Sequence, residues 1–384
     1  MRKSILRSGI IIFVVICTSC NHSAIEKSSK QEIVESMILA NDYFMEKWPD
    51  TGKDILQPTT GILWKSNIWT RGTYYTGLME LYKATEESHL LKYAEDWGES
   101  HNWKISPKEM WNDQLAGQTY IELYLMDTTR SELIADVKES IDAYIETGET
   151  GGREFGNNWN WVDAAYMAMP LFAQLGVITG EDLYFEHMHA LYTDMKDDVG
   201  GGLFNEEDGL WWRDADFVPP YQEPNGEDCY WSRGNGWVVG ALVRTLQILP
   251  ANSEYRIEYQ HMLKLMCEAL LKVQREDGMW NVSLHDPDHF GGREVTGSAF
   301  FLYGMAWGVN NELLDAGTYT TAINQGWNTM VKECLHPTGF LGHVQGTGKE
   351  PKDGQPVTYD SMPDFEDYGL GAFLLAGCEI IKMK

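Results

Sequence analysis

The chain has 384 residues and a formal net charge of −27, and 12% of its residues are aromatic, with 15 Trp and 19 Tyr. This length can bury a large core in one domain or two. The charge argues against nucleic acid as a partner, since no basic stripe could neutralise phosphates, and it also argues against binding to anionic membrane surfaces. An anionic substrate would need a local cation that opposes the overall field. The tryptophans and tyrosines, with an apolar face and a polar edge, are typical of a sugar-binding cleft or of an aromatic-rich core.

The N-terminus has the pattern of a bacterial export signal. Residues 1–7 are basic, residues 9–16 are apolar, and small residues precede Cys20, although Cys17 stands where an aliphatic residue is usual. The apolar run is too short to span a bilayer. We therefore expect residues 1–20 to be a signal peptide of the lipoprotein type, with plain secretion as the alternative. The expected location is the periplasm or the outer membrane and cell surface, with membrane attachment only through a lipid anchor at Cys20.

After a polar leader at residues 21–30, residues 31–384 have the pattern of a single helical domain without a linker. No regular series of alternating strand patterns occurs. Instead, apolar helices rich in Gly and Ala alternate with amphipathic, charged helices. The apolar helices are predicted to begin near Gly72, Leu115, Asp163, Gly234, Thr296 and Asp367. The amphipathic helices are predicted near residues 30–47, 87–99, 130–146, 181–196, 253–274 and 316–333.

Helices of two alternating kinds predict a double ring. Inner helices contact neighbours on all sides, so they can be apolar all round, whereas outer helices keep a polar face in water. The simplest closure is an all-α (α/α)6 barrel; an open α-solenoid is the competing arrangement, but the repeats are too unequal in length for it. Long interruptions rich in Gly, Pro, Asp and aromatic residues lie at about 199–231, 276–294 and 336–365. Because long loops in compact domains are usually functional, we expect them to form the rim of a pocket at one barrel end.

Two of the apolar helices open on a carboxylate that follows tryptophan. Asp163 comes after Trp159 and Trp161, and Asp113 comes after Trp111. An Asp near a helix N-terminus is favoured for structural reasons alone. Two such openings from distant parts of the chain nevertheless predict paired carboxylates that converge on an aromatic-lined pocket, as general acid–base chemistry requires.

The segment from Trp231 to Trp237, WSRGNGW, combines two tryptophans, one arginine and two glycines. Glycine lets the backbone approach a ligand closely, tryptophan offers a face for stacking on a sugar, and the planar guanidinium of Arg233 suits a carboxylate. A loop-to-helix junction pinned by aromatic packing is the structural alternative.

A second arginine lies between aromatic and acidic residues, in the segment Trp212-Arg213-Asp214-Ala215-Asp216. A surface ion pair of Arg213 with Asp214 or Asp216 explains this segment as well as a ligand contact does. Glu294 opens the fifth apolar helix, where we expect a cap or first-turn charge rather than a catalytic group.

The remaining cysteines and histidines show no metal-binding pattern. The cysteines have neither CxxC nor Cys/His spacing and identify no disulfide: Cys229, Cys267, Cys334 and Cys378. The histidines show no nucleophile or metal arrangement: His285, His289 and His343 among them. A phosphate-binding glycine loop is also missing. We therefore expect neither a metal nor an organic cofactor.

Four segments, in this order, resemble glycoside hydrolase family 105, whose relative family 88 shares the fold. They are WVDAAYMAMP, WSRGNGWVVGALVR, the run from Gly297-Ser298 to Asn310-Asn311, and DYGLGAFLLAG. The resemblance covers essentially the whole mature chain. It implies an (α/α)6-barrel hydrolase of the Δ4,5-unsaturated uronic acid that polysaccharide lyases leave at the non-reducing end of an oligosaccharide.

In such a sugar C4=C5 is an enol ether conjugated to a carboxylate. Protonation of C4 leaves oxocarbenium character at C5, water adds there, and the hemiketal opens with loss of the glycosidic bond, so the carboxylate-separation rule for ordinary glycosidases does not apply. The resemblance implies that Asp163 is the proton donor and also handles the water; apolar, Trp-lined surroundings suit a donor, since burial favours the protonated carboxyl group. It also implies Asp113 as a second acid that orients the substrate, Arg233 as the partner of the uronate carboxylate, and Trp231 and Trp237 as walls of the sugar site.

Two departures from the family pattern concern the substrate. Rhamnogalacturonan-type members carry a histidine where this chain has residues 151–155, and an aromatic–His pair where it has Trp212-Arg213. In a substrate site, Arg213 would meet an additional anionic group such as a sulfate or a second carboxylate. This favours unsaturated glucuronyl ends of ulvan or arabinogalactan fragments beside the rhamnogalacturonan type.

Three other functions remain as alternatives. One is an ordinary glycosidase of the same fold, acting on saturated glycans. A sugar epimerase is another, although epimerases of this architecture use paired histidines. The last is a non-catalytic, lipid-anchored glycan-binding protein, which has no need for Asp113 and Asp163 at convergent helix starts.

Overall fold

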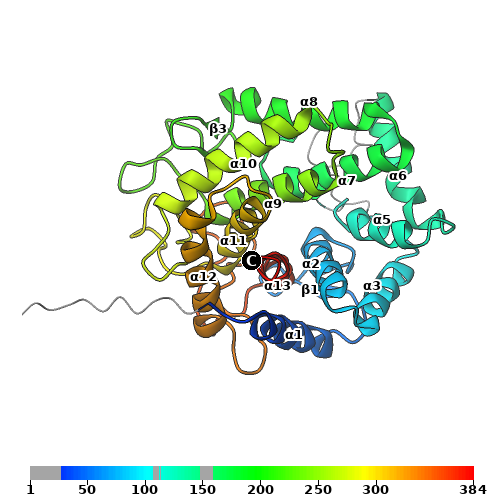
Figure 1. Ribbon diagram of the computed structural model, residues 1–384, viewed down its shortest axis with the longest axis horizontal. Coiled ribbons are helices and arrows are strands. Elements are labelled where there is room, and N and C mark those ends of the chain that lie inside the picture. The colour runs from blue at the N-terminus through cyan, green and yellow to red at the C-terminus, as the bar shows by residue number, and fades with distance from the viewer. Residues whose placement is uncertain (1–26, 107–111, 113, 148–158) are drawn as a thin grey trace, which may run out of the picture.

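The computed structural model describes residues 27–106, 112, 114–147 and 159–384 (Figure 1). An inner ring is formed by α2 (Trp69–Thr85), α5 (Ala116–Met126), α7 (Asp163–Thr179), α9 (Ser232–Ile248), α11 (Val295–Asn310) and α13 (Asp367–Ile380). An outer ring is formed by α1 (Lys30–Lys47), α3 (Ser88–Ser100), α6 (Glu132–Thr147), α8 (Asp182–Asp197), α10 (Tyr255–Lys272) and α12 (Ala316–Glu333).

The inner ring is closed. Each inner helix packs on the next along the chain, and α13 packs back on α2. The outer helices cover them in pairs, α1 on α13, α3 on α2, α6 on α5, α8 on α7, α10 on α9 and α12 on α11. The predicted (α/α)6 barrel in one domain is therefore the fold of the described residues.

Burial separates the two rings as the sequence pattern predicts. On α7 every residue from Asp163 to Gly176 is buried. Its outer partner α8 buries only a stripe: Tyr184, Met188, Leu191, Tyr192 and Met195. The inner helices must be apolar on every face because they have neighbours on every face, whereas α8 needs one apolar stripe.

The inner helices run in the same direction, so their N-terminal ends gather at one end of the barrel. Gly236 near the start of α9 lies against Gly297 near the start of α11. Trp69 at the start of α2 stacks on Tyr368 at the start of α13, with ring centroids 5.4 Å apart. The positive ends of these helix dipoles therefore point toward the same end of the barrel, which favours negative charge there.

The ring closes through a glycine contact between its first and last helices. A Cβ on Gly77 of α2 would lie 2.5 Å from the carbonyl oxygen of Gly371 on α13. We expect Gly77→Ala to force the two backbones apart and to lower the free energy of unfolding by about 1–3 kcal/mol, measured by denaturant unfolding. Gly317→Ala, at an exposed position of α12, is the control. A Cβ there meets only the Asp315 carboxylate, 3.2 Å away, and the variant should be neutral or stabilising. Equal stability of the two variants would contradict this packing account.

The three long interruptions lie at this same end, next to the inner N-termini, where the sequence analysis expects them. They include η1 (Val199–Gly201) and the hairpin of β3 (Phe204–Asn205) with β4 (Leu210–Trp211), while β1 (Ile55–Leu56) and β2 (Leu63–Trp64) precede α2. The loops are bonded to one another: Ser232 N–H donates to Val282 O at 2.9 Å, and Val295 N–H donates to His343 O at 2.9 Å. The starts of α9 and α11 are thereby fixed by the loops around them.

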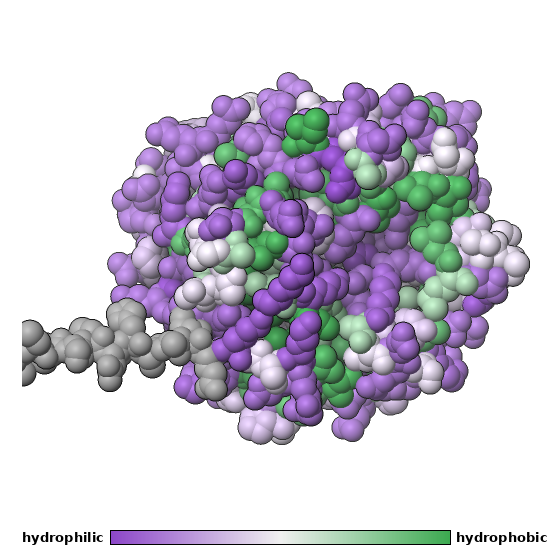
Figure 2. Space-filling view, viewed as in Figure 1, coloured by the Kyte–Doolittle hydropathy of each residue, from purple (hydrophilic) through white to green (hydrophobic). Residues whose placement is uncertain are grey.

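The other end of the barrel is hollowed between α2, α5, α7 and α9, and most of the residues that line the hollow are polar (Figure 2). A cavity of about 380 Å³ lies there among residues from the last turns of these helices, including Glu122, Gln174 and Arg244. Arg244 Nη2 donates to Glu122 Oε1 at 2.7 Å, and Lys83 Nζ lies 2.9 Å from Glu122 Oε2. This ion network fastens α2, α5 and α9 at the end away from Asp163.

Two findings bear on the cysteines and on membranes. All four cysteines of the described part are free and buried: Cys229, Cys267, Cys334 and Cys378. Among the helices of the described residues, none combines the length and the apolar character needed to cross a bilayer. The expected signal peptide and Cys20 lie outside the described residues.

Candidate active site

Asp163 is the first residue of α7, at the end of the barrel where the inner N-termini gather. The segment before it is held by the hairpin loop after β4: Val162 N–H donates to Arg213 O at 3.0 Å, and Trp161 forms an antiparallel bridge with Asp214. Asp163 is 8% exposed. The catalytic candidate is therefore buried, at a helix start whose entry is fixed by backbone pairing.

Arg213 contacts Asp163 directly. Its Nε donates to Asp163 Oδ2 at 3.1 Å, and its Nη1 donates to Asp214 Oδ2 at 2.6 Å. Within the described residues, Asp163 Oδ1 and Arg213 Nη2 have no hydrogen-bond partner. Burial disfavours the charge on Arg213, but Asp163 and Asp214 outweigh it and raise the pKa of the guanidinium. The site thus keeps a permanent cation, and in the described part of the chain one carboxylate oxygen and one guanidinium nitrogen are unpaired.

The pair of Arg213 with Asp214 was one expectation from the sequence, and it is present, although neither side chain is on the open surface. The pair of Arg213 with Asp163 was missed. No spacing could have shown it, because the two residues are 50 positions apart and come together only through the pairing of their loops.

Arg233 is 1% exposed, and its guanidinium is engaged by backbone carbonyls. Nη1 donates to Gln345 O at 2.7 Å and Nη2 to Gly346 O at 2.8 Å. The guanidinium lies over the rings of Trp231 and Tyr368, 4.5 and 5.0 Å from their centroids. Arg233 therefore fastens the loop before α13 to the start of α9. The role of Arg233 as the ligand of the uronate carboxylate stays a prediction, because both of its terminal nitrogens already donate to backbone carbonyls.

The predicted aromatic residues are buried around this junction. Trp231 Nε1 donates to Gln345 Oε1 at 2.8 Å. Trp237 is fully buried against aromatic rings, among them Tyr166 at 5.1 Å between ring centroids. Trp212, beside Arg213, stacks on Tyr230 at 5.9 Å. Trp231 and Trp237 have almost no exposed surface and Trp212 is 9% exposed, so sugar stacking on these rings stays a prediction.

Two other predicted acids have different outcomes. Asp113 lies outside the described residues, so its convergence with Asp163 stays a prediction. Glu294 is the N-cap of α11, where its carboxylate accepts the N–H groups of Thr296 at 2.9 Å and Gly297 at 2.6 Å. The expected capping role of Glu294 is thereby confirmed.

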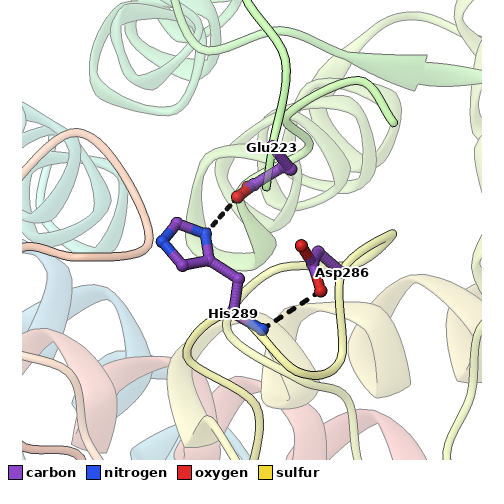
Figure 3. A group of neighbouring side chains, drawn as sticks. All are labelled: Glu223, Asp286 and His289. Atoms are coloured by element: carbon purple, nitrogen blue, oxygen red, sulfur yellow. Dashed lines mark hydrogen bonds and ion pairs between the residues drawn. The ribbon is translucent and has the colours of Figure 1, made fainter. Parts of the chain in front are cut away.

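One cluster of metal-type ligands was missed by the sequence analysis, which found no such arrangement for His289. Glu223, Asp286 and His289 place a ligand atom each within 4.8 Å of one another (Figure 3). The chain already satisfies them, because Asp286 accepts backbone N–H groups from Asn225, Asp288 and His289, and Glu223 binds His289 and the Ser283 hydroxyl. The cluster ties the loop before α9 to the loop before α11. Residue 223 lies 66 positions before residue 289, so the three residues form no recognisable metal motif in the sequence.

The comparisons with known proteins agree with this architecture. Residues 37–384 match the model of Glycosyl Hydrolase Family 88. The unsaturated 3S-rhamnoglycuronyl hydrolase of Formosa agariphila is 31% identical over 330 residues, which are 82% of this chain and 85% of the relative.

Two solved structures are 30% identical to this chain. A family 88 glycosyl hydrolase from Bacteroides vulgatus has a TM-score of 0.80, over 92% of this chain and 99% of that one. A protein described as a polysaccharide lyase also has a TM-score of 0.80, over 92% of this chain and 98% of that one. With a match over nearly its whole length, the chain belongs to glycosyl hydrolase family 88, the relative of the family 105 that its motifs resemble.

Proposed function

We propose that this enzyme removes the Δ4,5-unsaturated uronic acid from the non-reducing end of oligosaccharides that polysaccharide lyases generate. The observation that carries the proposal is the pair of Asp163 and Arg213: among the described residues, the acid keeps one oxygen and the permanent cation keeps one nitrogen without a hydrogen-bond partner. An unsaturated uronide needs both, a proton donor for its double bond and a cation for its carboxylate. The name of the Formosa agariphila relative, an unsaturated rhamnoglycuronyl hydrolase, supports the same substrate class.

The reaction follows from these groups. Asp163 gives its proton to C4 of the enol ether, and positive charge develops at C5 and the ring oxygen. Water adds to C5 and returns a proton to Asp163, whose Oδ2 stays fixed by Arg213. The resulting hemiketal opens by breaking the bond between C5 and the ring oxygen, which leaves a ketone at C5 and a hemiacetal at C1. The hemiacetal then releases the neighbouring sugar as its alcohol. Asp113 is the proposed second acid that orients the substrate.

Arg213 is the better placed of the two arginines to bind the uronate carboxylate. Its Nη2 has no partner in the described part of the chain, and its side chain is 20% exposed, whereas Arg233 is buried with two carbonyls bound. A charge-assisted contact at Nη2 would hold the substrate beside Asp163. A sulfate or second carboxylate is the other anion that this nitrogen suits, and it favours ulvan or arabinogalactan fragments.

One experiment tests the reaction and separates it from the nearest alternative. The purified protein is incubated with lyase digests of ulvan, rhamnogalacturonan and arabinogalactan, and the ultraviolet absorbance of the conjugated double bond is followed. Hydration removes this chromophore, so the absorbance falls in the digest that contains the substrate. A polysaccharide lyase, which one of the similar structures is described to be, would create the chromophore, so the absorbance of intact polysaccharide would rise. A saturated-glycan hydrolase or a binding protein would leave it unchanged.

We also propose that the enzyme is exported and anchored by lipid at Cys20. The basic, apolar and small-residue order of residues 1–20 supports this location. Membrane fractionation of bacteria that express the full chain should find it with the membranes, and Cys20→Ala should release it. Equal distribution of both proteins would refute the anchor.

A further inference from the structure

We propose that Asp214 is a positioning residue: it holds the guanidinium of Arg213 so that Arg213 contacts Asp163 through one nitrogen and keeps another for the substrate. The inference rests on the proposed function, since it concerns how the same site binds its anionic sugar.

The contact between the two side chains is short and partly shielded. Arg213 Nη1 lies 2.6 Å from Asp214 Oδ2, and the two side chains are 20% and 13% exposed. A charge-assisted hydrogen bond gains strength where water is partly excluded. This ion pair is therefore stronger than the surface pair that the sequence alone suggested.

Asp214 is itself fixed at two points. Its backbone bridges to Trp161, two residues before the catalytic Asp163. Its second oxygen, Oδ1, accepts the N–H of Asp216 at 2.9 Å, which closes a tight turn around the carboxylate. The carboxylate therefore acts as a rigid anchor whose place is set relative to α7.

Because a guanidinium is rigid, the contact with Asp214 fixes the orientation of the Arg213 side chain. Its nitrogens form a rigid, planar triangle around one carbon. Asp163 holds the Nε corner of Arg213 and Asp214 holds the Nη1 corner. Two fixed corners determine the direction of the third, Nη2, which has no hydrogen-bond partner among the described residues.

Without Asp214, another arrangement of the same residues becomes favourable. Arginine and carboxylate groups commonly pair through two parallel hydrogen bonds. Once Nη1 is released, Arg213 can rotate to bind Asp163 through Nε and Nη2 together. That pairing would occupy Arg213 Nη2, which is proposed to bind the substrate, and Asp163 Oδ1. Substrate binding and proton donation would both be weakened.

The chain offers a matched control two residues away. Asp216 is 72% exposed, and its carboxylate pairs with Lys349 at 2.8 Å rather than with Arg213. Asp216→Asn makes the same chemical change as Asp214→Asn, on the same loop, without touching the guanidinium.

The test uses the full chain and the lyase digest that the wild-type enzyme consumes. Asp214→Ala should lower kcat/KM by 10- to 100-fold, with a rise in KM and a fall in kcat. Asp214→Asn, whose amide oxygen still accepts from Nη1, should recover part of the loss, and Asp216→Asn should stay within two-fold of wild type. Combined with Arg213→Ala, Asp214→Ala should cost little more, because its effect acts through that arginine.

The outcomes separate the two proposals. A wild-type enzyme that leaves the double bond of every digest intact overturns the proposed function and this inference with it. An active enzyme in which Asp214→Ala keeps kcat/KM within two-fold overturns the inference alone. So does an equal loss with and without Arg213, because Asp214 would then act only through loop structure.

Discussion

Asp163→Asn is expected to lower kcat by about 10³-fold or more, within the range by which a positioned acid contributes to catalysis. The Asn amide has nearly the same shape as the Asp carboxyl group. In the wild type Arg213 Nε donates to Asp163 Oδ2 at 3.1 Å, and the amide oxygen of the variant can still accept from it. The amide has no proton acidic enough for C4 of the enol ether. The loss should therefore fall on kcat, measured by the decay of the double-bond absorbance, while KM changes little.

A matched variant controls for the general effect of removing an acid from a helix start. Asp182 is the first residue of α8, as Asp163 is of α7, but it is exposed on the outer ring. Asp182→Asn should keep wild-type kcat. Both variants should unfold within a few degrees of wild type. Turnover near the wild-type rate in Asp163→Asn would remove this residue from the chemistry.

Arg213→Ala is expected to lower kcat/KM by about 100-fold. Hydrogen bonds to charged groups contribute about 1.5–3 kcal/mol each, and this variant loses both the contact to the uronate carboxylate and the one to Asp163 Oδ2. Arg213→Lys should recover only part of the loss. The planar guanidinium can bind Asp163, Asp214 and the substrate through three different nitrogens, whereas lysine has a single ammonium nitrogen. Steady-state kinetics on the unsaturated oligosaccharide would measure both.

A comparison of Arg233→Ala with Arg213→Ala shows which arginine binds the uronate carboxylate of the substrate. Removal of Arg233 would leave the carbonyls of Gln345 and Gly346 without their donors inside a buried junction. Arg233→Ala should therefore lower the free energy of unfolding by several kcal/mol, at about 1–3 kcal/mol for each unsatisfied group. A stable Arg233→Ala protein with a high KM, together with a normal kcat/KM in Arg213→Ala, would return the substrate contact to Arg233.

Helices of the two rings could be predicted because burial on all faces and burial on one stripe leave different patterns. The fully buried run from Asp163 to Gly176 and the single stripe of α8 are examples. The helix boundaries were predicted less accurately: α2 begins at Trp69, three residues before the predicted start near Gly72. The first residues of α2 contact the start of α13, where Thr70 and Arg71 donate to Asp367, and no local sequence pattern shows these contacts.

The site was predicted less completely, for a physical reason. Asp163 could be found because a helix start, tryptophans and small residues are contiguous in the sequence. Its contact with Arg213 depends on two loops that pair through Val162 and Asp214. The WSRGNGW segment was recognisable as special, but its sequence could not show that the carbonyls of Gln345 and Gly346, more than a hundred residues later, occupy Arg233.

The most direct test of the account is where the solvent proton goes. The reaction is run in D₂O with the digest that the enzyme consumes, and the first product is examined by mass spectrometry and NMR before it can exchange. If an acid protonates C4, each released neighbouring sugar is matched by a uronic acid that has lost its double bond and carries deuterium at C4. A released uronic acid with C4=C5 intact and no deuterium would contradict it, because the bond would then have broken at the anomeric carbon without help from an acid at C4.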